Sequence, residues 1–371
     1  MSKVLQKIFR VAAIVAIFGT IAYVAQKHEQ QVAGAAQDPV AVAEKRQTVE
    51  ISGPIFGTFF GITVAGDYPG GEAELMHDAM EVLNRINAEI SAFDPNSELS
   101  RFNRLLSTDP FPVSEDTALM IAESFRAGRE LQGVMDITVG PLVNLWGFGR
   151  DRKPEGYVPS DEEIAATRAQ VGLDKLHLEY GYGGSFLRKD LPAMRIDLAT
   201  VGEGFAADAL AKMLDAAGIG NYLVHVAGAM RTRGRNPSGL PWKVAIEQPV
   251  DVIGAAGDII DIQNRAVSTA GTYRNYFEKD GRRYSHAIDP RSGKPVEHNT
   301  VSVTVIGDSA LFTDAMDTGL LVLGADEALR YANERGLAIY CIVKEPEGFR
   351  ARWSRAFRQY LAGAKGKPEE K

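Results

Sequence analysis

Residues 301–324 read VSVTVIGDSALFTDAMDTGLLVLG. Valines alternate from Val301 to Val305, which predicts a strand, and the apolar run over 310–323 predicts a helix directly after it. Residues 326–333 and 338–343 then predict a further helix and a closing strand. Strands and helices that mix without strict alternation favour an α+β fold, or an irregular α/β domain.

The chain upstream of this stretch continues the mixture. Residues 72–90 carry apolar side chains at helical spacing, and residues 114–131 predict a second helix. Ser160 with Glu163 forms a capping-box pair that opens another helix. The pattern also predicts a strand over 51–64 with a glycine-bearing bend, the end of a strand at 196–198, a helix over 204–217, and strands at 222–226 and 242–246. No repeat of fixed period is present.

Three polar side chains share one face of the helix predicted over 310–323. Asp314, Asp317 and Thr318 stand at positions i, i+3 and i+4, and apolar neighbours predict that part of this face is buried. Buried carboxylates without a counter-charge are expensive, and a hard cation such as Mg²⁺, which prefers oxygen ligands, would remove that cost. The alternative is a solvated helix N-terminus, where aspartates interact favourably with the helix dipole.

His286 lies between Ser285 and the turn DPRSG at residues 289–293. A histidine in this position could act as general base for a hydroxyl nucleophile, and a structural histidine is the alternative. The other five histidines lack the spacing of metal ligands, so a zinc site is not predicted.

Two glycine-bearing segments could contact a ligand. Residues 196–204 read IDLATVGEG, a junction whose glycines allow close backbone approach ahead of a helix N-terminus suited to phosphate. The segment is not a GxGxxG or Walker pattern, and a tight turn is the alternative. Residues 146–149 (WGFG) predict either an aromatic wall for a ring system or core packing.

Composition excludes some classes of protein. The 371 residues are 45% hydrophobic and 24% charged, with a formal net charge of −7. No basic face is evident, which argues against nucleic-acid binding. The single cysteine, Cys341, lies in an apolar run and cannot form an internal disulfide, so we expect a buried strand cysteine.

The N-terminus predicts export. Three basic residues, Lys3, Lys7 and Arg10, precede an apolar run of about fifteen residues, as in a secretion signal. No cysteine follows for lipoprotein anchoring, and no twin-arginine pair is present. We expect a periplasmic protein with a signal over residues 1–25, either cleaved or retained, with residues 8–25 then tethering it to the inner membrane. Residues 26–48 are the predicted linker.

Six segments, taken in order, resemble the bacterial FAD:protein FMN transferase (ApbE) family. They are GT at 57–58, FDPNSELSRFN at 93–103, DITVGPLVNLWGFG at 136–149, DLATVGEG at 197–204, YSH at 284–286 and DAMDT at 314–318. The resemblance covers roughly residues 51–345. It implies a single large α+β domain of the ApbE-like, T-fold-related type over residues 49–350, with a C-terminal segment over 351–371.

The resemblance also implies an activity. Such an enzyme uses Mg²⁺ to cleave the FAD diphosphate, attaches FMN through a phosphoester to a threonine (or serine) of exported flavoproteins such as membrane redox-complex subunits, and releases AMP. General chemistry is consistent with this activity. A threonine hydroxyl needs a base to become a good nucleophile, and a diphosphate needs a cation to reduce its repulsion of an incoming oxygen.

The family pattern assigns roles to particular residues. His286 would activate the acceptor hydroxyl. The metal would be held by Asp314, Thr318 and the Thr200 carbonyl. Asp317 would either bind the ion directly or contact one of its ligands. Flavin contacts would come from Phe56, Phe93, Asp94, Met135, Asp136, Ile137, Asp197, Glu203 and Ile288.

Three positions depart from the family pattern. Phe56 stands where methionine is common, Glu203 stands where many members have lysine, and residues 227–229 (AGA) lack an acidic residue often found there. Two other functions remain open from the sequence. One is an FAD pyrophosphatase that uses water and yields FMN and AMP, and the other is a flavin-binding module without catalysis.

Overall fold

The computed structural model describes residues 46–149, 153–154, 156–249 and 256–361. The predicted signal, most of the linker and the polar end of the chain lie outside these residues. Within the described ranges, no helix combines the length and the apolar character needed to cross a membrane.

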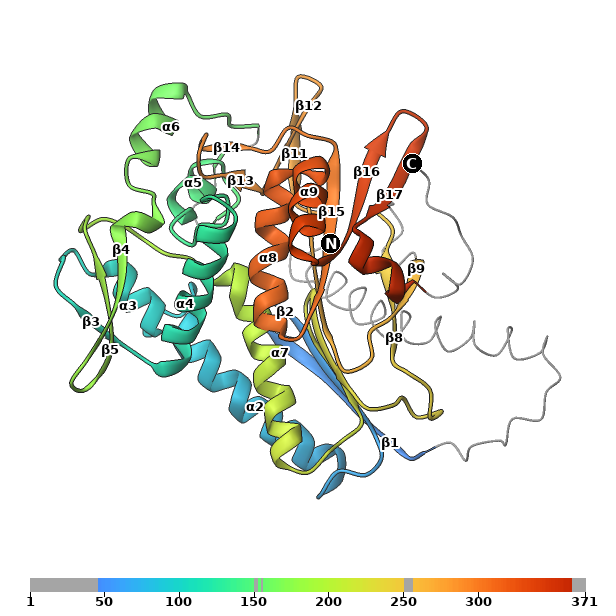
Figure 1. The fold of residues 1–371 in the computed structure, drawn as a ribbon. Coiled ribbons are helices and arrows are strands. Elements are labelled where there is room, and N and C mark those ends of the chain that lie inside the picture. The colour runs from blue at the N-terminus through green and yellow to red at the C-terminus, as the bar shows by residue number, and fades with distance from the viewer. Residues whose placement is uncertain (1–45, 150–152, 155, 250–255, 362–371) are drawn as a thin grey trace, which may run out of the picture.

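An antiparallel sheet of eight strands organises the fold, in the order β1-β2-β6-β7-β10-β15-β16-β17 (Figure 1). The strands are β1 (Thr48–Ile55), β2 (Thr58–Ala65), β6 (Tyr222–Val226), β7 (Ala229–Arg233), β10 (Ala266–Gly271), β15 (Thr300–Gly307), β16 (Ala338–Glu345) and β17 (Gly348–Trp353). The domain limit predicted at residue 350 falls within β17.

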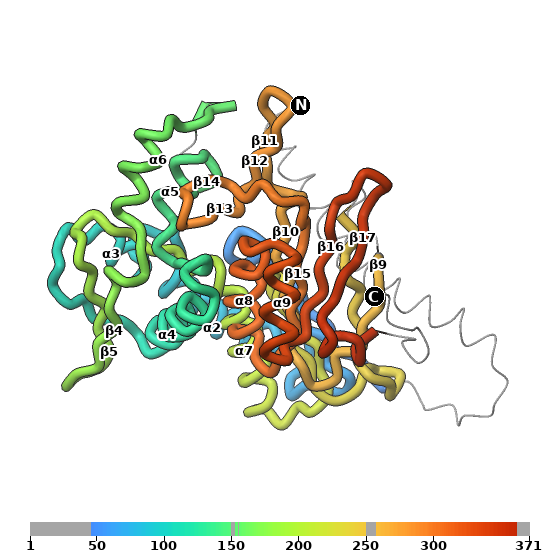
Figure 2. Tube along the Cα trace, turned by 45° about the horizontal axis from the view of Figure 1, so that its top comes forward, coloured from blue at the N-terminus to red at the C-terminus, as the bar shows by residue number. Residues whose placement is uncertain are grey.

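Helices cover one face of this sheet and build the main core. Helices α2, α7 and α8 lie along the sheet, and α4 and α9 pack beside α8 (Figures 1 and 2). The helices are α2 (Gly71–Ile90), α3 (Glu98–Arg104), α4 (Glu115–Glu130), α5 (Gly140–Leu145), α6 (Asp161–Arg168), α7 (Ala199–Ala216), α8 (Ala310–Leu323) and α9 (Ala325–Arg335).

The opposite face of the sheet is covered as well. The hairpin of β8 (Lys243–Glu247) and β9 (Ala256–Asp261) and the short helix η2 (Arg355–Tyr360) pack there in a second apolar cluster. On β16, Ile339 and Cys341 therefore point into the main core, while Tyr340 and Ile342 point into the second. Burial on both faces explains why 338–343 is an unbroken apolar run. Cys341 is buried on a strand, as expected.

Smaller units flank the main sheet. The strands β3 (Phe111–Val113), β5 (Gly184–Lys189) and β4 (Leu176–Gly181, preceded by the 3-10 turn η1, Leu173–Lys175) form a three-stranded sheet. Two hairpins lie in the region after β10: β11 (Tyr276–Lys279) with β12 (Arg282–Ser285), and β13 (Ile288–Asp289) with β14 (Lys294–Pro295).

The structure confirms most predicted elements, including the Ser160–Glu163 capping box, and corrects three. Residues 51–64 are two strands joined by a turn at Phe56–Gly57, because both residues have positive φ (52° and 80°), which reverses the chain. Helix α7 begins at Ala199 rather than at 204. Residues 196–198 pair with no strand, since other groups use the hydrogen-bonding positions of Ile196 and Asp197.

Lys189, at the end of β5, is fully buried, and no carboxylate among the described residues pairs with it. Its ammonium group donates to the carbonyls of Phe102 (3.2 Å) and Met194 (3.0 Å) and lies 4.7 Å from the centre of the Phe102 ring. Burial, with a smaller effect of the Arg195 charge, lowers the pKa of Lys189 from 10.5 to about 8.

Because of this lowered pKa, the free energy of unfolding changes with pH in the alkaline range. Between pH 8 and 10.5 the unfolded chain retains a proton on Lys189 that the folded chain has released, so stability increases with pH in that window. We expect the free energy of unfolding of the wild type to rise from pH 8 to 10 relative to Lys189→Met. Urea denaturation at several pH values measures it, and parallel curves for the two proteins would contradict the assignment.

Candidate functional site

Helix α8 brings two carboxylates into the protein interior. Asp314 and Asp317 are 6% and 2% exposed, which excludes the solvated helix end that the sequence left open. The Asp314 Oδ1 atom lies 3.4 Å from the Ser268 hydroxyl on β10, and the Thr318 hydroxyl donates to Asp317 over 3.2 Å. Ser268 also interacts with Asp317, so both acids face β10 of the sheet.

Glu203 on α7 adds a third acidic group. Burial raises the pKa of Asp314, and the charges of Asp317 and Glu203 raise it further. Burial likewise raises the pKa of Asp317 to about 8 and that of Glu203 to about 7. The Glu203 charge acts on both aspartates because α7 packs directly on α8 at this point. A cation placed among them would reverse these shifts, since an opposite charge favours the ionised form.

Gly204 allows the two helices to approach this closely. A Cβ atom at Gly204 would lie 2.2 Å from the Ala310 carbonyl oxygen and 2.6 Å from the Asp314 Cβ. The Gly204 N–H donates to Asp314 Oδ2 over 2.7 Å. In a regular helix this N–H bonds to the carbonyl four residues earlier, which is that of Thr200. Asp314 thus competes for the donor, and the Thr200 carbonyl is left more available to another partner.

The donors present fit a magnesium ion. Nowhere in the described ranges do three histidine, cysteine, aspartate or glutamate side chains form a metal cluster. Two carboxylates, a hydroxyl and a backbone carbonyl would therefore have to supply the ligands, and all are the oxygens that Mg²⁺ prefers. In addition, the Thr200 hydroxyl oxygen is buried and has no hydrogen-bond partner in the described part of the chain. An orphaned buried oxygen in the first turn of α7, one turn before Gly204, supports the fit.

His286 follows β12 directly and is held by one carbonyl. Its backbone N–H and its ring Nδ1 both contact the Asn275 carbonyl oxygen, at 3.0 and 3.1 Å. The Nδ1 must carry the proton for this bond, so the Nε2 is left as a proton acceptor. Burial lowers the pKa of His286, which keeps the ring neutral at pH 7. No hydrogen bond or ion pair among the described residues joins it to α8.

A row of stacked rings supports the hairpin before His286. Trp146 stacks on Tyr284 (5.6 Å between ring centres), Tyr284 on Phe277 (5.1 Å) and Phe277 on Phe148 (5.6 Å). Phe148 also meets His286 edge-on at 6.4 Å. The WGFG segment therefore contributes one buried ring, Trp146, and one half-buried ring beside the candidate base.

Among the predicted flavin contacts, two aromatic side chains have unusual placements. Phe56 is half-buried and has a left-handed backbone, which is uncommon for a bulky residue and is often found at functional sites. Phe93 is 72% exposed beside Asp94, in a loop whose N–H groups donate to the Ser91 hydroxyl. An exposed phenylalanine held in an ordered loop is available to a ring system.

The other predicted flavin contacts are less accessible. The side chains of Met135, Ile137 and Ile288 are at most 5% exposed and pack in the interior, so any flavin contact from them would have to use backbone atoms. Asp197 is half-buried, its N–H donates to the Ile137 carbonyl (2.7 Å), and its carboxylate accepts from the Ala199 N–H at the start of α7. Burial raises its pKa.

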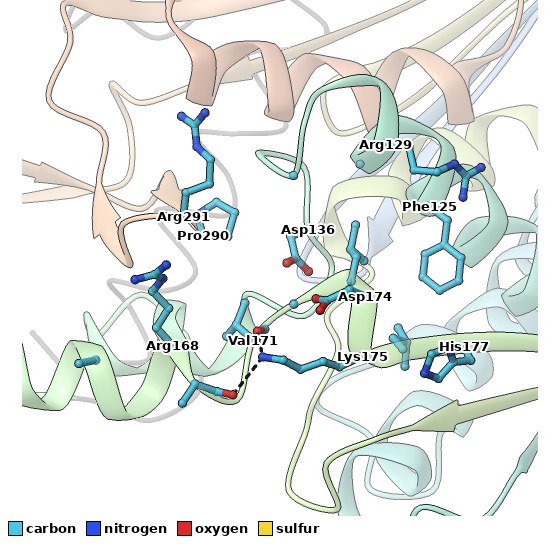
Figure 3. Close-up of a pocket in the computed structure, with 17 residues that line it drawn as sticks. Phe125, Arg129, Asp136, Arg168, Val171, Asp174, Lys175, His177, Pro290 and Arg291 are labelled. Atoms are coloured by element: carbon cyan, nitrogen blue, oxygen red, sulfur yellow. Dashed lines mark hydrogen bonds between the residues drawn. The ribbon is translucent and has the colours of Figure 1, made fainter.

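Asp136 borders a cavity of about 840 Å³ between α4, α6 and the turn after β13 (Figure 3). Its carboxylate accepts from the Thr138 N–H and hydroxyl, and burial raises its pKa. Several basic residues also line this cavity: Arg129, Arg168, Lys175 and Arg291. The acids of α8 and His286 do not. The candidate site is therefore identified by the buried acids of α7 and α8, and not by this cavity.

The structure thus brings Glu203 and the acids of α8 into one group, and it joins Asp197 to Ile137. It shows no contact that links Phe56 or Phe93 to that group within the described residues. Sequence reasoning missed Ser268, whose hydroxyl contacts Asp314, and the Gly228 N–H, which donates to Glu203. Ser268 is 46 positions from Asp314, and no local pattern signals such a pairing.

Residues 56–341 match the model of the ApbE family. The chain is 45% identical over 315 residues to the FAD:protein FMN transferase of Escherichia coli (strain K12), a match that covers 85% of this chain and 90% of that protein. It is 39% identical to the FAD:protein FMN transferase of Vibrio cholerae, over 85% of this chain and 93% of that protein.

Solved structures agree with the sequence matches. The flavin transferase ApbE from Vibrio cholerae superposes with a TM-score of 0.77 at 38% identity, over 85% of this chain and 99% of that one. The apo flavinyl transferase ApbE of Pseudomonas stutzeri gives a TM-score of 0.76 at 35% identity, over 85% and 98% of the two chains.

Proposed function

Because this chain belongs to the ApbE family, as an FAD:protein FMN transferase, we propose that its buried acids and His286 carry out the transfer on a threonine or serine hydroxyl. FAD is the substrate, and flavoproteins are the acceptors. The acceptor oxygen attacks the phosphorus on the FMN side of the diphosphate. The bond from that phosphorus to the oxygen of the AMP phosphate breaks, and AMP leaves.

The observation that carries the proposal is the group of acids at the start of α7 and on α8. Burial raises the pKa of Asp314, Asp317 and Glu203, and the Glu203 charge raises the pKa of both aspartates further. Mg²⁺ bound there would neutralise charge on the diphosphate and orient its oxygens. Asp314, Thr318, the Thr200 carbonyl and either oxygen of Asp317 are the groups that would hold it.

His286 takes the role of general base. Its ring is neutral, and the Asn275 carbonyl fixes the proton on Nδ1, so Nε2 can accept the proton of the acceptor hydroxyl as the new bond forms. The carbonyl also holds the ring in one orientation. A threonine hydroxyl at neutral pH is a poor nucleophile without such a base.

A pyrophosphatase that uses water is the second candidate, since the same acids and the same base would serve it. The two functions differ only in whether an acceptor protein or water occupies the space beside His286. The identity of the acceptor hydroxyl therefore decides between them, and it can be measured directly.

We expect the protein, incubated with FAD, Mg²⁺ and an exported flavoprotein domain that contains an accessible threonine, to add one FMN to that domain. Intact mass spectrometry of the denatured acceptor measures the gain, and EDTA should abolish it. Free FMN and AMP without a mass gain would favour the pyrophosphatase. FAD binding without either product, across several acceptors, would favour a binding module.

We also propose that the protein acts on the periplasmic side of the inner membrane, either released or tethered by residues 8–25, with subunits of membrane redox complexes as acceptors. The basic and apolar N-terminal sequence supports export. Fractionation of cells that produce the full chain, with N-terminal sequencing of the product, would reveal cleavage and location. A protein found in the cytoplasm with an intact N-terminus would contradict this proposal.

A further inference from the structure

In the segment between β5 and α7, a side chain takes the place of a neighbouring strand as the partner of the backbone. Residues 190–198 belong to no strand, yet Ile196 and Met194 are buried. The Asn103 side chain contacts Ile196 twice: its Nδ2 donates to the Ile196 carbonyl (2.8 Å), and its Oδ1 accepts from the Ile196 N–H (2.8 Å). One amide side chain thus satisfies both backbone groups of a buried residue.

Lys189 makes a second link between the same two segments. Its ammonium group bridges the carbonyls of Phe102 and Met194. Phe102 and Asn103 are neighbours in α3, and Met194 and Ile196 lie just before α7. Two side chains therefore tie the last turn of α3 to the residues that lead into α7.

Each side of this link reaches the candidate site. On one side, Ile196 is followed by Asp197, whose carboxylate accepts from the N–H of Ala199 at the start of α7, and then by Thr200 and Glu203. On the other side, the Ser97 and Ser100 hydroxyls at the start of α3 donate to the Ser91 carbonyl (2.5 and 3.0 Å).

The loop that follows Ser91 carries Phe93 and Asp94, and α3 spans the distance between that loop and the link. The position of the loop relative to the start of α7 is consequently set through a helix of seven residues, Glu98–Arg104.

We infer that Asn103 is a positioning residue for FAD, which, with Lys189, fixes the Phe93–Asp94 loop against the first turn of α7. The inference rests on the proposed function, because it takes both elements to contact the same FAD molecule. It requires no contact between Asn103 and FAD. Loss of the two bonds should let the elements shift, and a displacement of about 1 Å in a binding site can reduce its efficiency about 100-fold.

The test compares two asparagine variants. In Asn103→Ala both hydrogen bonds to Ile196 are lost, while those of Lys189 remain. Asn333→Ala is the matched control, because the Asn333 side chain is also half-buried and accepts from a backbone N–H, that of Arg355 (2.8 Å), between α9 and η2 where no candidate site residue lies. The affinity for FAD in the presence of Mg²⁺ is measured by titration of flavin fluorescence, together with thermal unfolding and the KM for FAD.

We expect both variants to lose a few degrees in Tm and only Asn103→Ala to bind FAD about tenfold more weakly, as one lost buried hydrogen-bonding pair allows. Hydrogen exchange at residues 196–202 should also become faster in that variant alone. Equal FAD affinities for the two variants would overturn the inference and leave Asn103 with a purely structural role.

Asn103→Asp gives a second test, which can still be carried out if the alanine variant does not fold. An ionised aspartate faces the Ile196 carbonyl with a negative oxygen, whereas a protonated one can donate to it and accept from the N–H, as asparagine does. Relative to the wild type at each pH, its FAD affinity should be reduced at pH 7.5 and restored toward pH 5. A deficit independent of pH would count against the inference.

Failure of the proposed function gives a different result. A wild type that binds FAD but neither cleaves nor transfers it overturns that function, while the affinity comparison still decides the role of Asn103. A wild type that binds no FAD overturns both.

Discussion

Replacement of His286 by alanine is expected to slow the transfer of FMN by about 100- to 10,000-fold, the range typical for loss of a general base. FAD affinity should change little, since the ring acts on the acceptor hydroxyl. The fold should also persist, because the Phe148, Phe277 and Tyr284 rings continue to support the hairpin. Transfer to a flavoprotein acceptor, followed by intact mass over time, gives the rate.

A second substitution distinguishes a role of His286 as a base from a role in holding its loop. His286→Asn retains an N–H near the Nδ1 position, which can still donate to the Asn275 carbonyl, but has no basic nitrogen. We expect it to be as slow as the alanine variant. His77→Ala, an exposed histidine on α2, serves as the control. A rate for His286→Asn close to that of the wild type would mean that His286 only holds the loop.

Asp314→Asn is expected to reduce Mg²⁺-dependent FAD turnover by at least about 100-fold, as removal of a preorganised charged group does in other enzymes. Asparagine preserves the size of the side chain and can still accept from the Gly204 N–H, so the packing of α7 on α8 should be maintained. The loss would therefore reflect the missing charge. Asp314→Ala should abolish turnover as well.

Stability should change in the opposite direction to activity. Without Mg²⁺, Asp314 is a buried acid repelled by Asp317 and Glu203, and its removal should leave Tm equal or higher at pH 8. Added Mg²⁺ should raise the Tm of the wild type, because it binds only the folded state, but not that of Asp314→Asn. Asp208→Asn is the control, since this α7 acid accepts from Ser309 and the Leu311 N–H outside the acidic group. Full turnover by Asp314→Asn at saturating Mg²⁺ would remove Asp314 from the metal ligands.

The predictable parts of the fold are those whose environment repeats along the chain. Helix α2 buries one stripe against the sheet, so its apolar residues recur every three or four positions, and the predicted limits match. Strand β16 is buried on both faces and reads as an apolar run, and β15 alternates valines with buried serine and threonine. In each case neighbouring residues meet the same surroundings, and the sequence records this as a pattern.

The predictions that were wrong concern segments whose partners lie far away in the chain. Residues 196–198 have strand-like composition, but Asn103, 93 positions upstream, takes the place of a neighbouring strand. Helix α7 already includes residues 199–203, where the Asp197 carboxylate accepts from the Ala199 N–H, and the glycines of 202–204 obscured this start.

The burial of Asp314 and Asp317 was predictable from their apolar neighbours on α8. The approach of Glu203 was not, because it depends on the lack of a Cβ at Gly204, where α7 meets α8.

The order of strands in the main sheet has a consequence for how the molecule forms. Strand β2 pairs with β6, more than 150 residues later, and β7 pairs with β10 across the β8–β9 insertion. Such non-local pairing has a high contact order and folds slowly. The N-terminal hairpin must therefore wait, as an unpaired edge, until most of the chain has been synthesised. Because Glu203 on α7 and the aspartates of α8 come from segments about 110 positions apart, the acidic group forms only once α8 has docked on α7.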